Sequence, residues 1–164
     1  MSRLCCEEVL ANRKGRATRH DWIVYAAACW ALIFAAFHIV WAAGWYIGLD
    51  PEQARAMFAV TWKLVYDLVV AGMCIVAVPV ALAVVMPWGQ RAPRRLLGPL
   101  LWTGTGLLLL RAVASLVETA YLVVINQFSW RDMGVWEPWF YLGATLFGIT
   151  LWRYWREGSA GAAA

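Results

Sequence analysis

Five ionisable residues lie inside long apolar stretches of the sequence: His38, Lys63, Asp67, Arg111 and Glu118. A charged side chain near the centre of a bilayer costs about 2.5–3.5 kcal/mol on insertion scales, so it needs a partner, water or a function. Carboxyl and imidazole groups can donate and accept protons, and a guanidinium can bind an anionic group. These five positions are therefore where the sequence predicts chemistry.

Three of them are candidates for general acid–base catalysis, namely Glu118, Asp67 and His38. Each also has a purely structural interpretation. Asp67 could be the i,i+4 partner of Lys63 at a wet helix end, and His38 could be a hydrogen-bonded packing residue. For Glu118 the structural alternative is a buried charge network, shared with Arg111, that fixes the register of neighbouring helices.

Ligand contacts are expected from a second set of residues, namely Arg111, Trp41 and Ser115. Arg111 shares a helix face with Glu118, because seven residues make nearly two helical turns, and Ser115 lies between them. Trp41 lies one turn after His38, where an aromatic wall suits a flat or greasy ligand, although the same spacing is ordinary in helix packing. The expected ligand is a lipophilic small molecule.

The composition is that of an integral membrane protein. Of the 164 residues, 63% are hydrophobic and only 15% are charged, which is too apolar for a soluble domain of this size. Four continuous apolar runs reach the about 20 residues that a helix needs to cross a bilayer. They are Trp22–Ile47, Trp62–Met86, Leu97–Ile125 and Trp136–Trp155. The sequence predicts an all-α, integral membrane four-helix bundle over residues 22–155, in a multi-pass protein of the cell membrane.

Basic residues indicate the topology of this bundle. They gather before the first run, between the second and third runs, and after the fourth run: Arg3, Arg13, Lys14, Arg16, Arg19, Arg91, Arg94, Arg95, Arg153 and Arg156. By the positive-inside rule, both termini and the middle connection are cytoplasmic. Residues 1–21 then form a basic cytoplasmic leader against lipid head groups, and residues 156–164 form a disordered tail. This distribution explains the net charge of +4 without nucleic acid.

Helix geometry predicts that the ionisable residues meet. With the N-terminus inside, His38 and Glu118 each lie about 13 Å below the outer ends of their runs, and Asp67 lies about 8 Å below the outer end of its own. Because the cost of leaving them in lipid is high, we expect His38, Asp67, Arg111 and Glu118 to face the interior and converge in its outer half.

The connections and glycines add local predictions. Asp50 followed by Pro51 predicts the capped start of a short interfacial helix over Pro51–Phe58. Three prolines predict a loop over Pro87–Pro99. Four glycines are candidates for close helix contacts: Gly104, Gly106, Gly143 and Gly148. No strict G-x-x-x-G motif marks a dimer face, and an oligomer stays open.

No metal or cofactor is predicted. The sequence has no H-E-x-x-H motif, and only His20 and His38 are available to bind haem. No C-x-x-C motif occurs among the four cysteines, which disfavours a quinone-coupled thiol oxidoreductase. The expected partners are membrane lipids.

A family resemblance is carried by three segments. Phe37–Gly44, with the sequence FHIVWAAG, resembles the His-x-x-Trp-x-x-Gly signature in the first span of a family of small bacterial four-span membrane proteins catalogued as a domain of unknown function. Leu108–Ala112 is similar to its third-span Leu-Arg segment, and Trp136–Phe140 resembles the aromatic, proline-containing start of its fourth span. Trp45 replaces the family's second glycine. The resemblance implies the fold and the choice of site residues, but no reaction.

Three classes of function remain. A non-catalytic ligand-binding, accessory or resistance protein is favoured, because no motif names a reaction. The alternative is a membrane enzyme, such as an isomerase, cyclase or hydrolase, that performs acid–base chemistry on a lipophilic substrate. The third class is proton or solute transport by an oligomer, since four spans are few for a monomeric transporter and no inverted repeat is visible.

Overall fold

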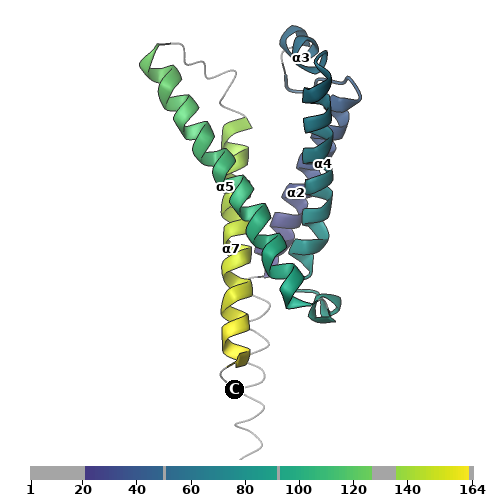
Figure 1. Ribbon diagram of the computed structural model, residues 1–164, viewed down its shortest axis with the longest axis vertical. Helices are drawn as coiled ribbons and strands as arrows, with labels where there is room; N and C mark the ends of the chain where they lie inside the picture. The colour runs from purple at the N-terminus through teal and green to yellow at the C-terminus, as the bar shows by residue number, and fades with distance from the viewer. Residues whose placement is uncertain (1–20, 50, 92, 127–135, 163–164) are drawn as a thin grey trace, which may run out of the picture.

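The computed structural model describes residues 21–49, 51–91, 93–126 and 136–162 (Figure 1). All regular structure in these ranges is helical, which confirms the all-α class. The helices are α2 (Asp21–Ala42), α3 (Pro51–Phe58), α4 (Thr61–Leu82), the 3₁₀ helix η1 (Pro87–Arg91), α5 (Arg94–Val124) and α7 (Trp136–Ala162). The predicted basic leader and the Asp50 cap lie outside the described residues.

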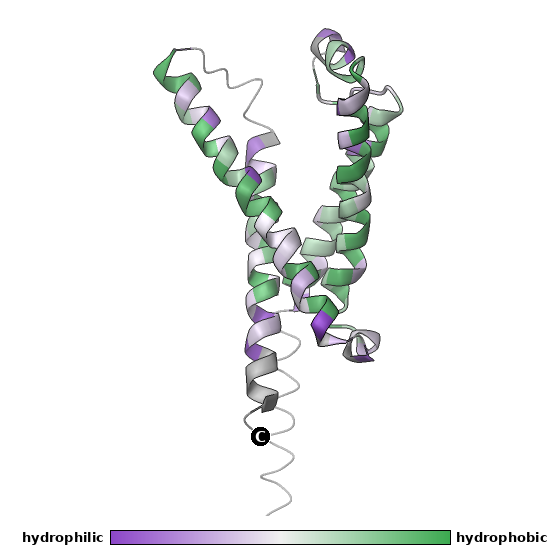
Figure 2. Ribbon diagram, viewed as in Figure 1, coloured by the Kyte–Doolittle hydropathy of each residue, from purple (hydrophilic) through white to green (hydrophobic). Residues whose placement is uncertain are grey.

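Three helices, α2, α4 and α5, are long and apolar enough to cross a membrane, and they indicate a multi-pass membrane protein. Figure 2 shows apolar residues along most of their lengths. The predicted fourth span, α7, is not among these three. Its uncharged stretch, 138–152 between Glu137 and Arg153, is shorter than the about 20 residues of a typical span.

The short helix predicted over Pro51–Phe58 is confirmed, and the first predicted span ends earlier than expected. α3 covers Pro51–Phe58, as the Asp-Pro signal predicts. α2 ends at Ala42 rather than near Ile47, because Gly44 takes a φ of 90° and reverses the chain. The reversed segment is held by the Trp41 indole, whose Nε1 donates to the Ile47 carbonyl at 3.0 Å.

The third and fourth helices are longer than predicted. α5 begins at Arg94 and runs through Pro99, so the loop prediction for Pro87–Pro99 is wrong over its second half. The burial of Leu97 and Leu101 outweighs the local cost of a proline inside the helix. α7 continues to Ala162, through most of the segment expected to be disordered.

The helices form a bundle that is open on one side. α2 packs along α4 and also against α7, while α5 packs mainly against α7. Figure 1 shows α5 leaning away from α2 and α4 toward its C-terminal end. We call the end of the molecule that holds α3 and the C-terminal ends of α2 and α5 the upper half. In the upper half, α4 and α5 diverge.

Trp30 of α2 is the centre of the packing against α7. It is only 4% exposed, and its Nε1 donates to the Trp139 carbonyl at 3.1 Å. A Cβ on Gly143 would lie 2.3 Å from the Trp30 ring, so close approach requires glycine there. This confirms the expectation for Gly143. A Cβ would meet nothing within 4 Å at the other three candidate contacts, Gly104, Gly106 and Gly148, so the close-contact prediction is wrong for them.

The lower ends of α2 and α7 are joined by an ion pair. Arg153 Nη2 lies 2.9 Å from Asp21 Oδ1. The arginine side chain is 11% exposed and the aspartate side chain 30%, so the pair is only partly shielded from solvent. Together with Trp30, this pair fixes α7 alongside α2 and leaves α5 as the outermost helix of the upper half.

Candidate functional site

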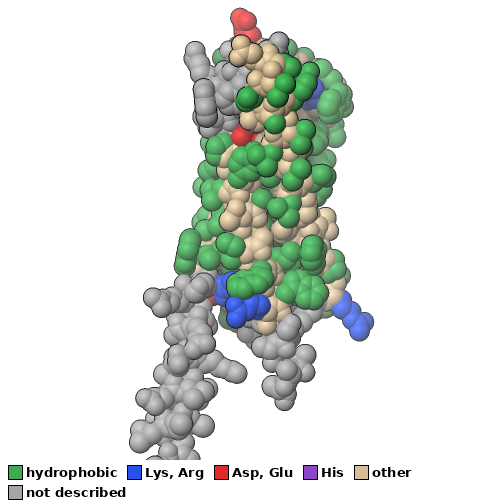
Figure 3. All heavy atoms as spheres, turned by 90° about the vertical axis from the view of Figure 1, so that its left-hand side faces the viewer, with side chains coloured by type: hydrophobic (Ala, Val, Ile, Leu, Met, Phe, Trp, Pro, Cys, Tyr) green, Lys and Arg blue, Asp and Glu red, His purple; other side chains and the backbone are tan. Residues whose placement is uncertain are grey.

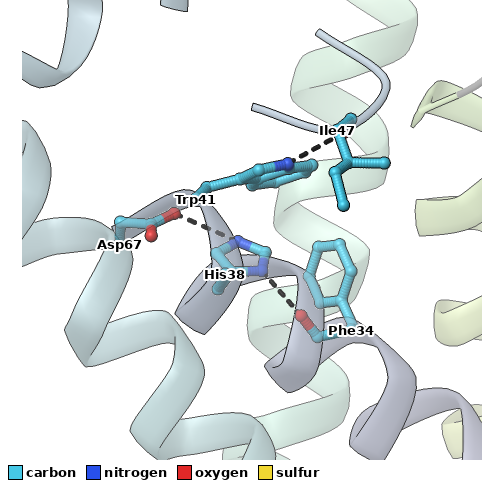
Figure 4. Close-up of polar contacts among 5 residues, drawn as sticks. All are labelled: Phe34, His38, Trp41, Ile47 and Asp67. Atoms are coloured by element: carbon cyan, nitrogen blue, oxygen red, sulfur yellow. Dashed lines mark hydrogen bonds and ion pairs between the residues drawn. The ribbon is translucent and has the colours of Figure 1, made fainter. Parts of the chain in front are cut away.

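A buried histidine–aspartate pair links α2 to α4 in the upper half (Figure 4). His38 Nε2 lies 3.7 Å from Asp67 Oδ1, and the two residues are 7% and 6% exposed. The other ring nitrogen, Nδ1, lies 2.8 Å from the carbonyl oxygen of Phe34, one helical turn earlier. The structure therefore brings together two of the three residues predicted for proton transfer.

At 3.7 Å the His38–Asp67 contact is an ion-pair distance rather than a hydrogen bond, and its chemistry favours one proton held by the pair. The Phe34 carbonyl can only accept a hydrogen bond, so His38 Nδ1 carries a hydrogen. A bare Nε2 lone pair facing an ionised carboxylate would be repulsive in an apolar interior. The pair is therefore either an imidazolium with a carboxylate or a neutral imidazole with a protonated carboxyl group. Both forms have no net charge, which suits a site at this depth in a membrane.

The second carboxyl oxygen of Asp67 has no partner. Oδ2 is buried and accepts no hydrogen bond from any residue in the described ranges. Leaving a buried acceptor unsatisfied costs about 1–3 kcal/mol. Asp67 lines a cleft, so its carboxyl group is a candidate acceptor for a donor inside that cleft.

The cleft has a volume of about 530 Å³ and lies between α2, α3 and α4 on one side and α5 and α7 on the other. Most of its lining is apolar, and the aromatic members are Phe34, Trp41, Phe58, Trp62, Tyr66 and Phe140. Its ionisable members are His38, Lys63, Asp67 and Arg111. We refer to it as the upper cleft. A mostly apolar cavity with a few convergent polar groups is the usual form of a small-molecule site.

Arg111 reaches the upper cleft from α5, and its acidic partner lies on another helix, α7. Its Nη2 lies 3.4 Å from Oε1 of Glu137, and its guanidinium lies 4.3 Å from the centre of the Phe140 ring. Glu137 is a functional candidate that the sequence reasoning missed. An acidic residue in the first turn of a helix has an ordinary local explanation, and nothing in the sequence marks a partner 26 residues away.

Glu118 does not join the other residues. It is exposed, it is not part of the upper cleft, and it forms no ion pair within the described ranges. α5 leans away from α2 and α4 toward its C-terminal end. Because Glu118 lies two turns closer to that end than Arg111, it is farther from α2 and α4. The expectation that Glu118 converges with His38 and Asp67 is therefore wrong.

The remaining candidates divide between the cleft and the helix packing. Trp41 lines the upper cleft, with its ring centre 5.2 Å from that of His38. Ser115 is fully buried, and its hydroxyl lies 3.4 Å from that of Tyr141, so it packs α5 against α7 rather than lining the cleft. Lys63 lines the cleft, with its Nζ 5.8 Å from the centre of the Trp62 ring.

A search for metal-binding geometry among the described residues finds no group of three or more His, Cys, Asp or Glu side chains that could hold a metal ion. The upper cleft itself contains the His38–Asp67 pair, the cations Lys63 and Arg111, and aromatic side chains.

Comparison with known proteins places this site within a family. No curated protein and no solved structure matches the chain. Residues 31–147 match the family described as "Protein of unknown function (DUF3995)". The matched region contains α3, α4, α5, most of α2 and the first part of α7, and it includes every residue of the upper cleft. The chain therefore belongs to this family of unknown function.

Proposed function

We propose that this protein is a small integral membrane protein that binds a lipophilic molecule in the upper cleft, in a non-catalytic, accessory or resistance role. One observation carries the proposal: the Asp67 carboxyl, which is buried, paired with His38 and has one oxygen without a partner among the described residues, belongs to the wall of an apolar-lined cavity. A buried polar atom without a partner is unfavourable, and a ligand donor at this position removes that cost.

Identification of what co-purifies with the protein tests this proposal. We expect organic extraction of the purified protein, followed by mass spectrometry, to yield one lipophilic species in near-stoichiometric amount. A different membrane protein, purified in the same detergent from the same cells, controls for carried-over bulk lipid. An extract indistinguishable from that control would contradict the proposal.

A second function, that of a membrane enzyme, is favoured by the proton of the His38–Asp67 pair. A general acid–base group must hold a transferable proton within reach of its substrate, and this pair forms part of the cleft wall. An isomerase, cyclase or hydrolase acting on a lipophilic substrate would use it in this way. Chemical change of the extracted ligand during incubation with the wild type, but not with Asp67→Asn, would assign the enzyme rather than the binding protein.

We also propose that α7 crosses the membrane and that both termini are cytoplasmic. α7 lies beside α2 and α5 and is tied to the start of α2 through Arg153 and Asp21. Figure 3 shows hydrophobic side chains over the middle of one face and basic side chains at its lower end. The positive-inside rule then places the lower end in the cytoplasm.

Cysteine labelling checks this topology. In a variant whose four native cysteines are replaced by serine, we expect Glu52→Cys in α3 to react with a membrane-impermeant maleimide on intact cells. Pro93→Cys, between η1 and α5, should react only after permeabilisation, because it lies beside the basic residues Arg91 and Arg95. Labelling of position 93 on intact cells would contradict the assignment.

A further inference from the structure

An apolar groove lies between α4 and α5, below the upper cleft. It has a volume of about 300 Å³. Its walls include Met73, Val76 and Val80 of α4 and Leu100, Leu101 and Leu107 of α5. Apart from Thr103, its lining has no polar side chain, so it suits a hydrocarbon chain rather than a polar molecule.

The groove continues the upper cleft along both helices. On α4, Val70 lines the cleft and Met73 lines the groove, which is less than one helical turn further on. On α5, Arg111 lines the cleft and Leu107 lines the groove, about one turn apart. The two cavities therefore lie end to end along α4 and α5, with a polar, cationic upper part and an apolar lower part.

Two glycines keep the groove open. Gly72 of α4 and Gly104 of α5 both line it, and a Cβ at either position would meet nothing within 4 Å. Glycines in membrane helices commonly allow close helix contact, whereas here they face empty space. Helices in a bilayer associate largely through van der Waals packing, so this space is stable only when hydrocarbon fills it.

We infer that a single glycerophospholipid occupies this path, with an acyl chain in the groove and its head group in the upper cleft. The inference rests on the proposed binding function and specifies its ligand. Along α4, the groove from Gly72 to Val80 corresponds to about 12 Å of helix rise, which accommodates part of an extended acyl chain.

The charges of the upper cleft specify the head group. Lys63 forms no ion pair within the described part of the chain, and the Arg111 side chain is 37% exposed although it also contacts Glu137. Lysine and arginine side chains bind anionic phosphate groups through charge-assisted hydrogen bonds. The Asp67 carboxyl, which also lines the cleft, is an acceptor for a donor on the same head group. A head group with an anionic phosphate and a free hydroxyl satisfies both, and phosphatidylglycerol has this chemistry.

The test uses the full-length protein in nanodiscs of phosphatidylcholine that contain phosphatidylglycerol. Native mass spectrometry of the released protein measures the retained phosphatidylglycerol. We expect Gly104→Leu, which fills the groove, to weaken retention by at least about tenfold. Gly72→Leu should do the same from the opposite wall. The matched control is Gly106→Leu, because Gly106 is on the same helix, has equally open space, and does not line the groove.

The outcomes separate the inference from the proposed function. Wild-type retention in both groove variants, together with loss in Asp67→Asn, would overturn the acyl-chain assignment and leave the cleft as a ligand site. Equal retention of phosphatidylcholine and phosphatidylglycerol by the wild type would overturn the head-group assignment. Absence of any retained amphiphile from the wild type would overturn the proposed function itself.

Discussion

Asp67→Asn should release the ligand of the upper cleft and leave the fold intact. The amide has the shape of the carboxyl group, but its nitrogen is a donor, so the residue loses an acceptor where Oδ2 now lacks a partner. Loss of a hydrogen bond to a charged group costs about 1.5–3 kcal/mol, which corresponds to about a ten- to hundredfold loss of affinity. Titration of the purified protein with the extracted ligand measures this change.

The fold should tolerate this substitution because His38 can become neutral. The amide nitrogen of an asparagine at this position can donate to the vacated Nε2, while Nδ1 continues to donate to Phe34. No unpaired charge is left buried, so the large cost of breaking a buried ion pair does not apply. We therefore expect only a small change in the melting temperature in detergent.

Glu118→Gln is the matched control for this experiment. It makes the same acid-to-amide change in another membrane-crossing helix, at a residue that is exposed and lies outside the upper cleft. Ligand affinity and melting temperature should both be unchanged. Loss of the ligand in Glu118→Gln and its retention in Asp67→Asn would place the site on α5 and contradict the account.

Gly143→Ala should strongly destabilise the bundle. Its Cβ would lie 2.3 Å from the Trp30 ring, and Trp30 is buried between α2 and α7, where its indole also donates to the Trp139 carbonyl. Overpacking of this kind costs about 1–3 kcal/mol. The melting temperature and the yield of monodisperse protein in detergent should both fall.

Two further variants isolate the cause. Gly148→Ala adds the same methyl group to α7 at a position with nothing within 4 Å, so it should stabilise the helix slightly, by up to about 1 kcal/mol. In a Trp30→Leu background, Gly143→Ala should cost much less, because the large ring is gone. Equal effects of Gly143→Ala in both backgrounds would show that the ring contact is not the cause.

Much of the fold follows from local sequence features. The apolar runs predict where α2, α4 and α5 lie, and the Asp-Pro signal predicts α3 because proline and acidic residues favour the first turn of a helix. Counting helix rise also places both His38 and Asp67 in the outer half of the predicted bundle, about 5 Å apart in depth, and the structure pairs them. This prediction succeeds because depth depends on position along a helix and hardly on tertiary packing.

The failures concern properties that depend on how the helices cross. Glu118 has a depth similar to that of His38, but the lean of α5 separates them. The partner of Arg111 is Glu137, on a helix whose rotation the sequence does not specify. The sequence predicts a close helix contact at both Gly143 and Gly104, yet only Gly143 contacts Trp30, whereas Gly104 lines the open groove. Which side chains meet between two helices depends on the angle at which the helices cross, and a few packing contacts set that angle.

An experimental structure of the protein, purified with its native lipids, would test the central claim most directly. The account predicts elongated density in the upper cleft and along the groove between α4 and α5, with a donor atom of the bound molecule within hydrogen-bonding distance of Asp67 Oδ2. A structure in which α4 and α5 close on each other, the cleft is absent and a protein group donates to Asp67 Oδ2 would contradict it.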